Sequence, residues 1–103
     1  MDAMSPEFEA DCRALLGRFF ATCPDATMRE RAHSALRLLR ASEKPLKGKV
    51  EGWAAGIVYF VTTDGRFPCG VPDMLNADFE QLMHTSMGTA RYRAARVREL
   101  IVF

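Results

Sequence analysis

The side chains best suited to chemistry in this 103-residue chain lie near its C-terminus. Four arginines occur within residues 91–98, and each arginine has a planar donor fork that matches the acceptors of phosphate groups and guanine bases. Such side chains could contact the phosphates or base edges of a nucleic acid. The last helix would offer Thr89, Arg91, Tyr92, Arg93 and Arg96 as such contact groups.

Two C-terminal helices would have to position these side chains. Residues 77–84 and 87–100 show helical periodicity, and Ser86 is expected to cap the second helix. The tight turn between them gives the layout of a helix-turn-helix. Two positions depart from the usual pattern, because His84 stands where glycine normally makes the turn and Glu80 where a small residue normally lets the helices touch.

The same helix is also compatible with a purely structural role for its arginines. On a helical wheel the core stripe consists of Met87, Ala90, Ala94, Val97 and Ile101. Arg91 and Arg98 flank one side of this stripe. Arg93 and Arg96 flank the other side, so the arginines form no single basic face. Three acidic residues just upstream would repel phosphate, namely Asp73, Asp78 and Glu80.

The charge of the chain is nearly balanced overall, at +1, but it is uneven along the sequence. Residues 31–49 carry six basic side chains and one acidic, whereas residues 1–30 and 50–90 are acidic on balance. The first basic block includes Lys44, Lys47 and Lys49. Whether these lysines join the arginines of the last helix in one surface depends on the fold.

The residues from Gly52 to Val61 carry no charge, whereas almost every other ten-residue window carries several. A helix that is apolar on all sides must be covered on all sides, so we expect residues 49–63 to form a central helix. Residues 57–63 are rich in β-branched and aromatic side chains, which favour a strand, but no partner strand occurs elsewhere in the sequence. The core residues expected from this helix are Trp53, Gly56, Ile57, Tyr59 and Phe60.

Capping signals mark the other helices. Ser5 and Pro6 suit the start of a first helix, Thr27 and Glu30 form a capping box, and Asn76 is expected to cap the fourth helix. The sequence therefore predicts an all-α fold that forms one domain over residues 1–103. Its five expected helices span residues 6–22, 27–41, 49–63, 77–84 and 87–100.

The sequence gives little support to an enzyme, a cofactor or a small-molecule substrate. No glycine-rich phosphate loop, nucleophile elbow or metal-ligand spacing occurs, and we expect no metal site. Three dispersed cysteines, Cys12, Cys23 and Cys69, are expected to be buried thiols in a cytoplasmic protein. No run of eighteen apolar residues occurs, so we expect no membrane span.

Two motifs resemble a known family. Residues 48–61, Gly-Lys-Val-Glu-Gly-Trp-Ala-Ala-Gly-Ile-Val-Tyr-Phe-Val, resemble the central helix of the cyclin-like repeats of the general transcription factor TFIIB. Residues 89–93 resemble the start of the last helix of those repeats. The combination Gly-Lys-x-Glu-x-Trp-Ala-Ala-Gly-Ile-Val-Tyr is more closely similar to a bacterial domain family with no assigned activity. The resemblance implies an orthogonal bundle around 50–63, and it implies DNA contacts from Ser86, Thr89, Arg91 and Arg93.

Two functions of different classes follow from these observations. The first is a non-enzymatic DNA-binding module, and its candidate contact residues are Ser86, Thr89, Arg91, Arg93, Arg96, Lys47 and Lys49. The alternative is a protein-interaction module that binds a partner or a second copy of the chain. It would use a cyclin-like groove or the apolar tail formed by residues 100–103.

Overall fold

The structure, a computed structural model, describes residues 5–42, 46–63, 71 and 74–101. Within these ranges it contains helices and no strand, so the predicted all-α class is confirmed. The helices are α1 (Pro6–Thr22), α2 (Ala26–Ala41), α3 (Val50–Thr63), α4 (Asn76–Met83) and α5 (Met87–Leu100). The strand alternative for residues 57–63 is excluded, because these residues belong to α3. The predictions for Lys44, Cys69 and Asp73 lie outside the described residues.

Local side-chain hydrogen bonds determine where several helices begin, and two of the predicted caps are wrong. Ser5 caps α1 as predicted, since its Oγ accepts from the backbone N–H of Phe8 at 3.0 Å. The Thr27–Glu30 capping box is not formed. Instead Asp25 caps α2, because it has an extended backbone and its Oδ1 accepts from the N–H of Met28 at 3.0 Å. An aspartate two residues earlier thus starts the helix before Thr27.

The second wrong cap is Asn76. This residue is the first residue of α4, and Leu75 precedes the helix in an extended conformation without a side-chain hydrogen bond. The first turn of α4 is held by a backbone hydrogen bond, in which the N–H of Phe79 donates to the carbonyl of Leu75 at 3.0 Å. The helix also ends one residue earlier than predicted, at Met83, and α3 begins at Val50 rather than at residue 49.

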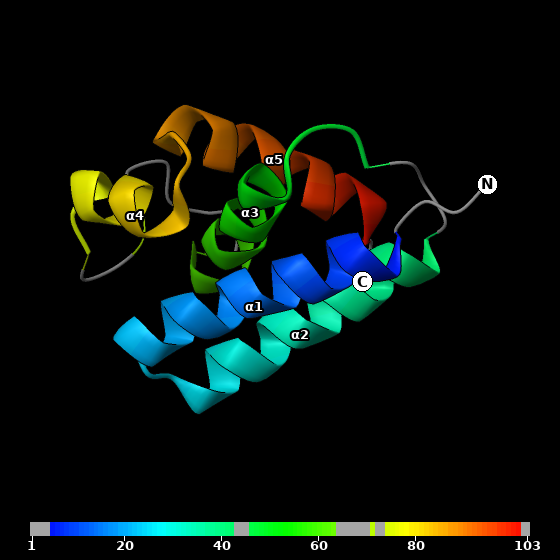
Figure 1. Cartoon of the computed structure of the whole chain (residues 1–103), viewed down its shortest axis with the longest axis horizontal. Helices are drawn as coiled ribbons and strands as arrows, with labels where there is room; N and C mark the ends of the chain where they lie inside the picture. Colours follow the sequence, from blue (N-terminus) through cyan, green and yellow to red (C-terminus); the bar gives the residue numbers. More distant parts are fainter. Residues whose placement is uncertain (1–4, 43–45, 64–70, 72–73, 102–103) are drawn as a thin grey trace.

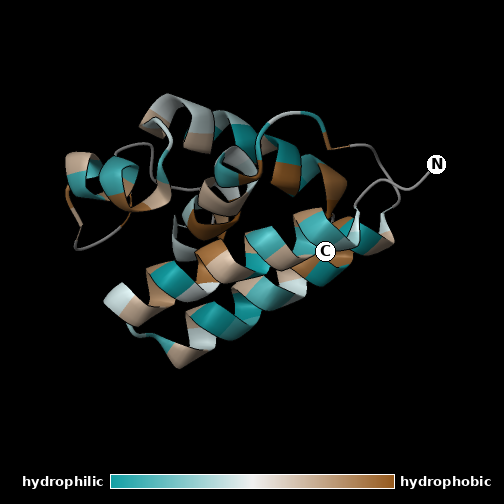
Figure 2. Cartoon of the chain, viewed as in Figure 1, coloured by the Kyte–Doolittle hydropathy of each residue, from teal (hydrophilic) through white to brown (hydrophobic). Residues whose placement is uncertain are grey.

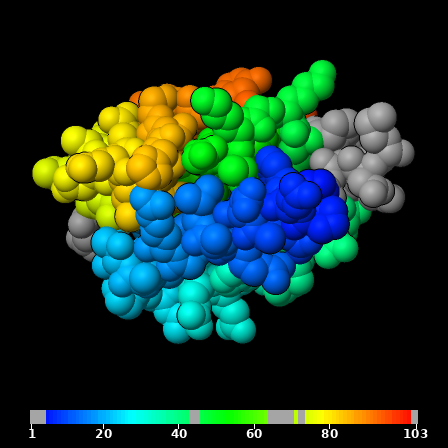
Figure 3. All heavy atoms as spheres, in the orientation of Figure 1, coloured from blue at the N-terminus to red at the C-terminus, as the bar shows by residue number. Residues whose placement is uncertain are grey.

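The helices form two sides of the molecule with α3 between them. Helices α1 and α2 lie antiparallel on one side, α5 lies on the other, and α4 packs at one end (Figure 1). Helix α3 contacts all four other helices, and its most extensive contact is with α5. Figure 3 shows α1 crossing the near face of the molecule, so that little of α3 is visible beyond its first turn.

The core is built on α3. Every residue from Gly52 to Val61 is buried, which includes all five core residues expected from the sequence. The apolar side chains of this helix from Trp53 to Val61 are buried. Figure 2 shows hydrophilic residues along much of α1 and α2. Phe19 of α1 closes the core toward α4 through edge-to-face contacts with Phe20 and Phe79, at centroid distances of 4.9 and 6.1 Å. The contact between Phe19 and Phe79 holds α4, and hence the turn that follows it, against the rest of the fold.

Two glycines of α3 let α5 approach closely. A Cβ atom on Gly56 would lie 2.6 Å from Cβ of Arg93 and 3.0 Å from the backbone N of Ala94. A Cβ on Gly52 would lie 3.1 Å from Cγ2 of Thr89. Because the backbone of α5 cannot yield as a flexible side-chain end can, the contact at Gly56 requires the absence of a side chain.

We predict that Gly56→Ala destabilises the fold by about 1–3 kcal/mol, since the added methyl group forces α5 away from α3. The matched control is Gly17→Ala on the exposed surface of α1, where an added Cβ would meet nothing within 4 Å. The control should stabilise the protein by up to about 1 kcal/mol through helix propensity. Urea unfolding followed by circular dichroism measures both changes. Equal stability of Gly56→Ala and the parent would contradict the close approach of the two helices.

His33 on α2 makes the stability of the folded protein depend on pH. The side chain is half-buried. Burial lowers the pKa of His33 below its ordinary value of 6.5, and the positive charges of Arg13, Arg29 and Arg37 lower it further. The folded protein therefore favours the neutral imidazole. As pH falls below about 6.5, the unfolded chain binds a proton more readily than the folded one, so stability decreases.

We predict that His33→Gln reduces this acid destabilisation. The urea midpoint of the parent should fall between about pH 7 and pH 5, and the fall should be smaller in the variant. Carboxylate groups contribute equally to both proteins and cancel in the difference. The effect is modest because His33 is partly exposed to solvent. A steeper fall in the variant than in the parent would overturn this assignment.

Candidate nucleic-acid interface

The turn between α4 and α5 has the length and backbone geometry of a helix-turn-helix turn. It consists of His84, Thr85 and Ser86, and His84 adopts the left-handed conformation (φ 55°, ψ 40°) that glycine usually provides. This conformation costs a residue with a side chain roughly 1–2 kcal/mol. A hydrogen bond between Nη2 of Arg18 and Nε2 of His84, at 2.6 Å, holds the imidazole against α1. Because a guanidinium only donates, Nε2 accepts and the ring proton resides on Nδ1.

Glu80 joins the two helices in a way that the sequence pattern did not indicate. The sequence suggested that this residue would keep the helices apart, but its Oε2 accepts from the backbone N–H of Met87 at 2.7 Å. Ser86 caps the same helix end, since its Oγ accepts from the N–H of Thr89 at 3.1 Å. The predicted cap is confirmed, and the first turn of α5 is held by two oxygen acceptors from outside the helix.

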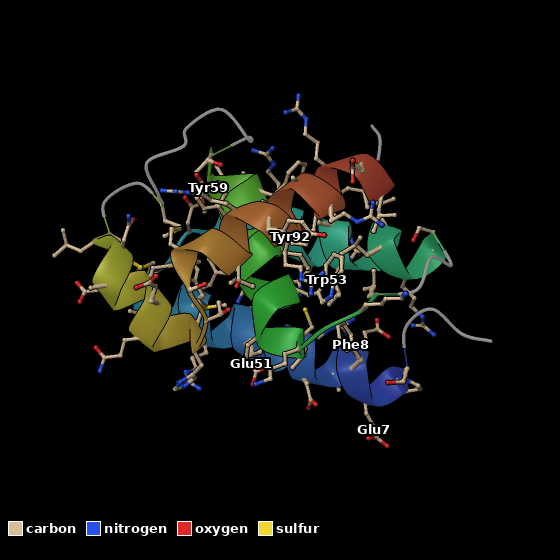
Figure 4. All side chains as sticks on the ribbon, turned by 90° about the horizontal axis from the view of Figure 1, so that it is seen from above. Glu7, Phe8, Glu51, Trp53, Tyr59 and Tyr92 are labelled. Carbon is tan, nitrogen blue, oxygen red and sulfur yellow. The ribbon has the colours of Figure 1, made fainter. Side chains whose placement is uncertain are left out.

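Arg93 packs against α3, although it was considered as a contact residue. Its Cζ lies 4.9 Å from the centroid of the Trp53 ring and 5.4 Å from that of Tyr92. Figure 4 shows these two aromatic residues close to where α5 crosses α3. The side chain is half-buried, and its Nε is buried without a hydrogen-bond partner among the described residues. Arg93 thus stabilises the helix crossing through cation–π contacts.

The sequence contains a signal for this placement. Gly48, Gly52 and Gly56 recur every four residues, and a Cβ on any one of them would contact the Arg93 side chain. Together they leave a shallow channel for the arginine. Gly56 was expected in the core, but the four-residue spacing that it shares with Gly48 and Gly52 was not used in the prediction. Gly48 has a φ of 105°, which glycine adopts without strain.

The other candidate residues are distributed over three places. Thr89 is half-buried against Gly52. Arg96 pairs with Glu99 at 2.7 Å on the surface of α5. Lys47 and Lys49 are exposed, and the carbonyl of Lys47 accepts from Nε1 of Trp53 at 3.0 Å.

Arg91 belongs to the surface that we call the outer face of α5. This face consists of the exposed residues Gly88, Arg91, Tyr92, Ala95, Arg98 and Glu99. Tyr92 is 63% exposed, which is high for a large aromatic side chain. The two arginines form no ion pair or hydrogen bond with any described residue. Arg98 was not among the predicted contact residues, although the helical wheel placed it beside Arg91.

A second polar feature, which we call the α3–α5 pocket, adjoins the turn. It has a volume of about 340 Å³. Its lining comes from the start of α3 (Lys49, Glu51, Gly52) and from the turn and α5 (His84, Thr85, Thr89, Arg93). The fold thus brings three of the seven predicted contact residues into one pocket, and it leaves Arg91 on a different surface. Two larger cavities, of about 480 and 400 Å³, lie near the other end of α3.

The described residues contain no cluster of three or more His, Cys, Asp or Glu side chains that could hold a metal ion. Cys12 is fully buried, and burial raises the pKa of its thiol to about 12, so it is not a nucleophile at neutral pH. None of the helices in the described ranges has the length and apolar character needed to cross a membrane.

Comparison with known proteins gives no family for the chain. No protein-family model matches it, and neither a curated protein nor a solved structure matches it significantly.

We predict that Glu80→Ala destabilises the protein by about 1–2 kcal/mol, because it leaves the N–H of Met87 without its acceptor. Glu80→Gln keeps an acceptor oxygen and should lose less. Gln81→Ala, at the exposed neighbouring position on α4, is the control and should stay within about 0.5 kcal/mol of the parent. Thermal unfolding measures stability, and amide hydrogen exchange at Met87 reports the local effect. Unchanged exchange in Glu80→Ala would show that this cap does not hold α5.

Proposed function

We propose that this chain is a DNA-binding module in which α4 and α5 act as a helix-turn-helix and the outer face of α5 contacts DNA. The observation that carries the proposal is the pair Arg91 and Arg98, both exposed and both unpaired with any described residue. They are seven residues apart, which places them on one side of the helix and about 10 Å apart along its axis. Two such guanidinium groups suit phosphate oxygens or guanine acceptors.

The residues around these arginines favour close contact. Gly88 and Ala95 are exposed and small, so they leave room for the α5 backbone to approach a groove or a phosphate backbone. Tyr92 adds a hydroxyl group and an apolar ring to the same face. The turn residues hold α5 at its first turn, which limits the movement of this face relative to the core.

The nearby acids weaken the proposal less than the sequence suggested. Glu99 pairs with Arg96, and Glu80 accepts a hydrogen bond from the start of α5. Asp78 stays exposed on α4. The alternative, a protein-binding tail, receives no support from its described part, because Ile101 is 3% exposed and packs in the core.

The proposed architecture is that of a cyclin-like repeat of the TFIIB type, with α3 as its central helix. This assignment is supported by the motif over residues 48–61 and by the contact of α3 with every other helix. It is an analogy of fold, and the DNA-binding proposal depends on the surface of α5 rather than on it.

Anisotropy titrations of a short fluorescent duplex at about 50 and 200 mM salt test the proposal, because affinity from phosphate contacts falls steeply with salt. We expect salt-dependent binding by the parent. The double variant Arg91→Gln, Arg98→Gln should bind at least about tenfold more weakly, and its salt slope should be smaller by about one for each arginine.

The matched control removes two positive charges from α2, on the opposite side of the molecule from α5, through Arg29→Gln and Arg37→Gln (Figure 1). It should bind almost as tightly as the parent. Equal weakening by both double variants would indicate attraction to overall charge and would overturn the assignment of the outer face. Absence of binding at low salt would reject the DNA function and favour a protein partner.

A further inference from the structure

We propose that the α3–α5 pocket binds a phosphate group. This inference goes beyond the proposed function, because the pocket residues differ from the outer face of α5. The pocket lies where the start of α3, the turn before α5 and the first half of α5 meet. Its volume of about 340 Å³ is ample for a phosphate group with part of the molecule that carries it.

Two cations in the pocket have no acidic partner among the described residues. Lys49 is exposed and forms no ion pair with a described residue. Arg93 is half-buried, and its Nε is enclosed without a hydrogen-bond partner among the described residues. A buried donor without an acceptor costs about 1–3 kcal/mol, and more when it is charged. An anion in the pocket would relieve this cost, so the arrangement favours a ligand with several acceptor oxygens.

The guanidinium of Arg93 is already held in place. Its contacts with the rings of Trp53 and Tyr92, at 4.9 and 5.4 Å, and the channel formed by the glycines of α3 restrict its rotamers. A ligand that binds such a fixed group loses less conformational entropy than one that must order a free arginine. Arg93 is therefore suited to bind an anion even though it also supports the fold.

Neutral donors complete the pocket. Thr85 contributes a hydroxyl group with no hydrogen-bond partner among the described residues. Gly52 lies in the first turn of α3, where backbone N–H groups have no acceptor within the helix. His84 presents its Nδ1–H, because its Nε2 is occupied by Arg18. Donors from several directions suit a tetrahedral phosphate better than a planar carboxylate.

Glu51 is the one group in the lining that opposes an anion. Its carboxylate is outnumbered by Lys49 and Arg93, and Arg18 adds a third positive charge next to His84. This residue therefore gives the proposal its sharpest test. Its neutralisation should tighten the binding of phosphate, whereas it would weaken the binding of a cation.

The experiment is a titration of the full chain with inorganic phosphate, followed by nuclear magnetic resonance of backbone amides and arginine Nε–H groups. Sodium chloride at the same ionic strength is the reference. We expect saturable shifts at Gly52, Thr85 and the Arg93 Nε–H, with a Kd of roughly 1 mM, typical of a weak single-site ligand. Shifts that do not saturate, or that match those in chloride, would indicate general ionic effects and overturn the proposal.

Matched variants locate the site. Lys49→Gln should weaken phosphate binding at least about fivefold, a loss of about 1 kcal/mol, whereas Lys47→Gln removes the same charge two residues away and should change it less than twofold. Glu51→Gln should tighten binding by a similar factor. All three positions are on the surface or partly exposed, so the variants should fold, and unfolding midpoints check this. Equal effects of the two lysine variants would overturn the proposal.

Two further arms identify the source of the phosphate and separate this proposal from the DNA function. Adenosine monophosphate replaces inorganic phosphate in one arm, and tighter binding would indicate a free phosphate ester. In the other arm, duplex DNA is titrated in the presence of saturating phosphate. Competition beyond that of chloride at equal ionic strength would place a DNA phosphate in the pocket, and unchanged DNA affinity would show an independent site. If the protein does not bind DNA, the phosphate titration still tests the pocket. If it does not bind phosphate, the DNA titration still tests the outer face of α5.

Discussion

The close approach of α3 and α5 is the constraint on which the rest of this structure depends. At Gly56 the backbone of α3 lies against the Cβ of Arg93 and the backbone of α5, with no space for a Cβ atom on the glycine. Close packing of this kind buries Ala90, Ala94 and Val97 of α5 against the apolar length of α3. Because α3 is covered by α1 and α2 on its other sides, the position of α5 follows from that of α3. The surface of α5 is thus fixed by the core.

This constraint also sets which arginines of α5 can act in recognition. A helix with four arginines in eight residues looks uniformly basic in the sequence, but its neighbours divide them. Arg93 falls on the side of α3 and is held by Trp53, and Arg96 is paired with Glu99. Only Arg91 and Arg98 remain exposed and unpaired among the described residues of this helix. The helical wheel correctly places Arg91 and Arg98 on one side of the core stripe. Which arginines are packed or paired depends on tertiary contacts that the wheel does not show.

The parts of the fold that depend on local chemistry could be predicted from the sequence. Ser5 and Ser86 cap their helices because a hydroxyl oxygen reaches an N–H three residues on, which needs no knowledge of the rest of the chain. The apolar character of α3 likewise predicts its burial. Even here, a competing local signal misleads, because Asp25 caps α2 in place of Thr27.

The interactions that define the candidate site are mostly not local. The Arg18–His84 hydrogen bond joins residues 66 positions apart, and the packing of Arg93 requires glycines from another helix to lie opposite it. Neither the hydrogen bond nor the facing of the two helices follows from periodicity. The four-residue spacing of Gly48, Gly52 and Gly56 indicates that something large lies against α3, but it does not identify the side chain. The packing of Arg93 against Trp53 and the glycines explains why Arg93 is not on the outer face of α5. It also explains why the Nε of this charged side chain is buried. The buried Nε of Arg93, which has no hydrogen-bond partner among the described residues, is the observation from which the phosphate proposal starts.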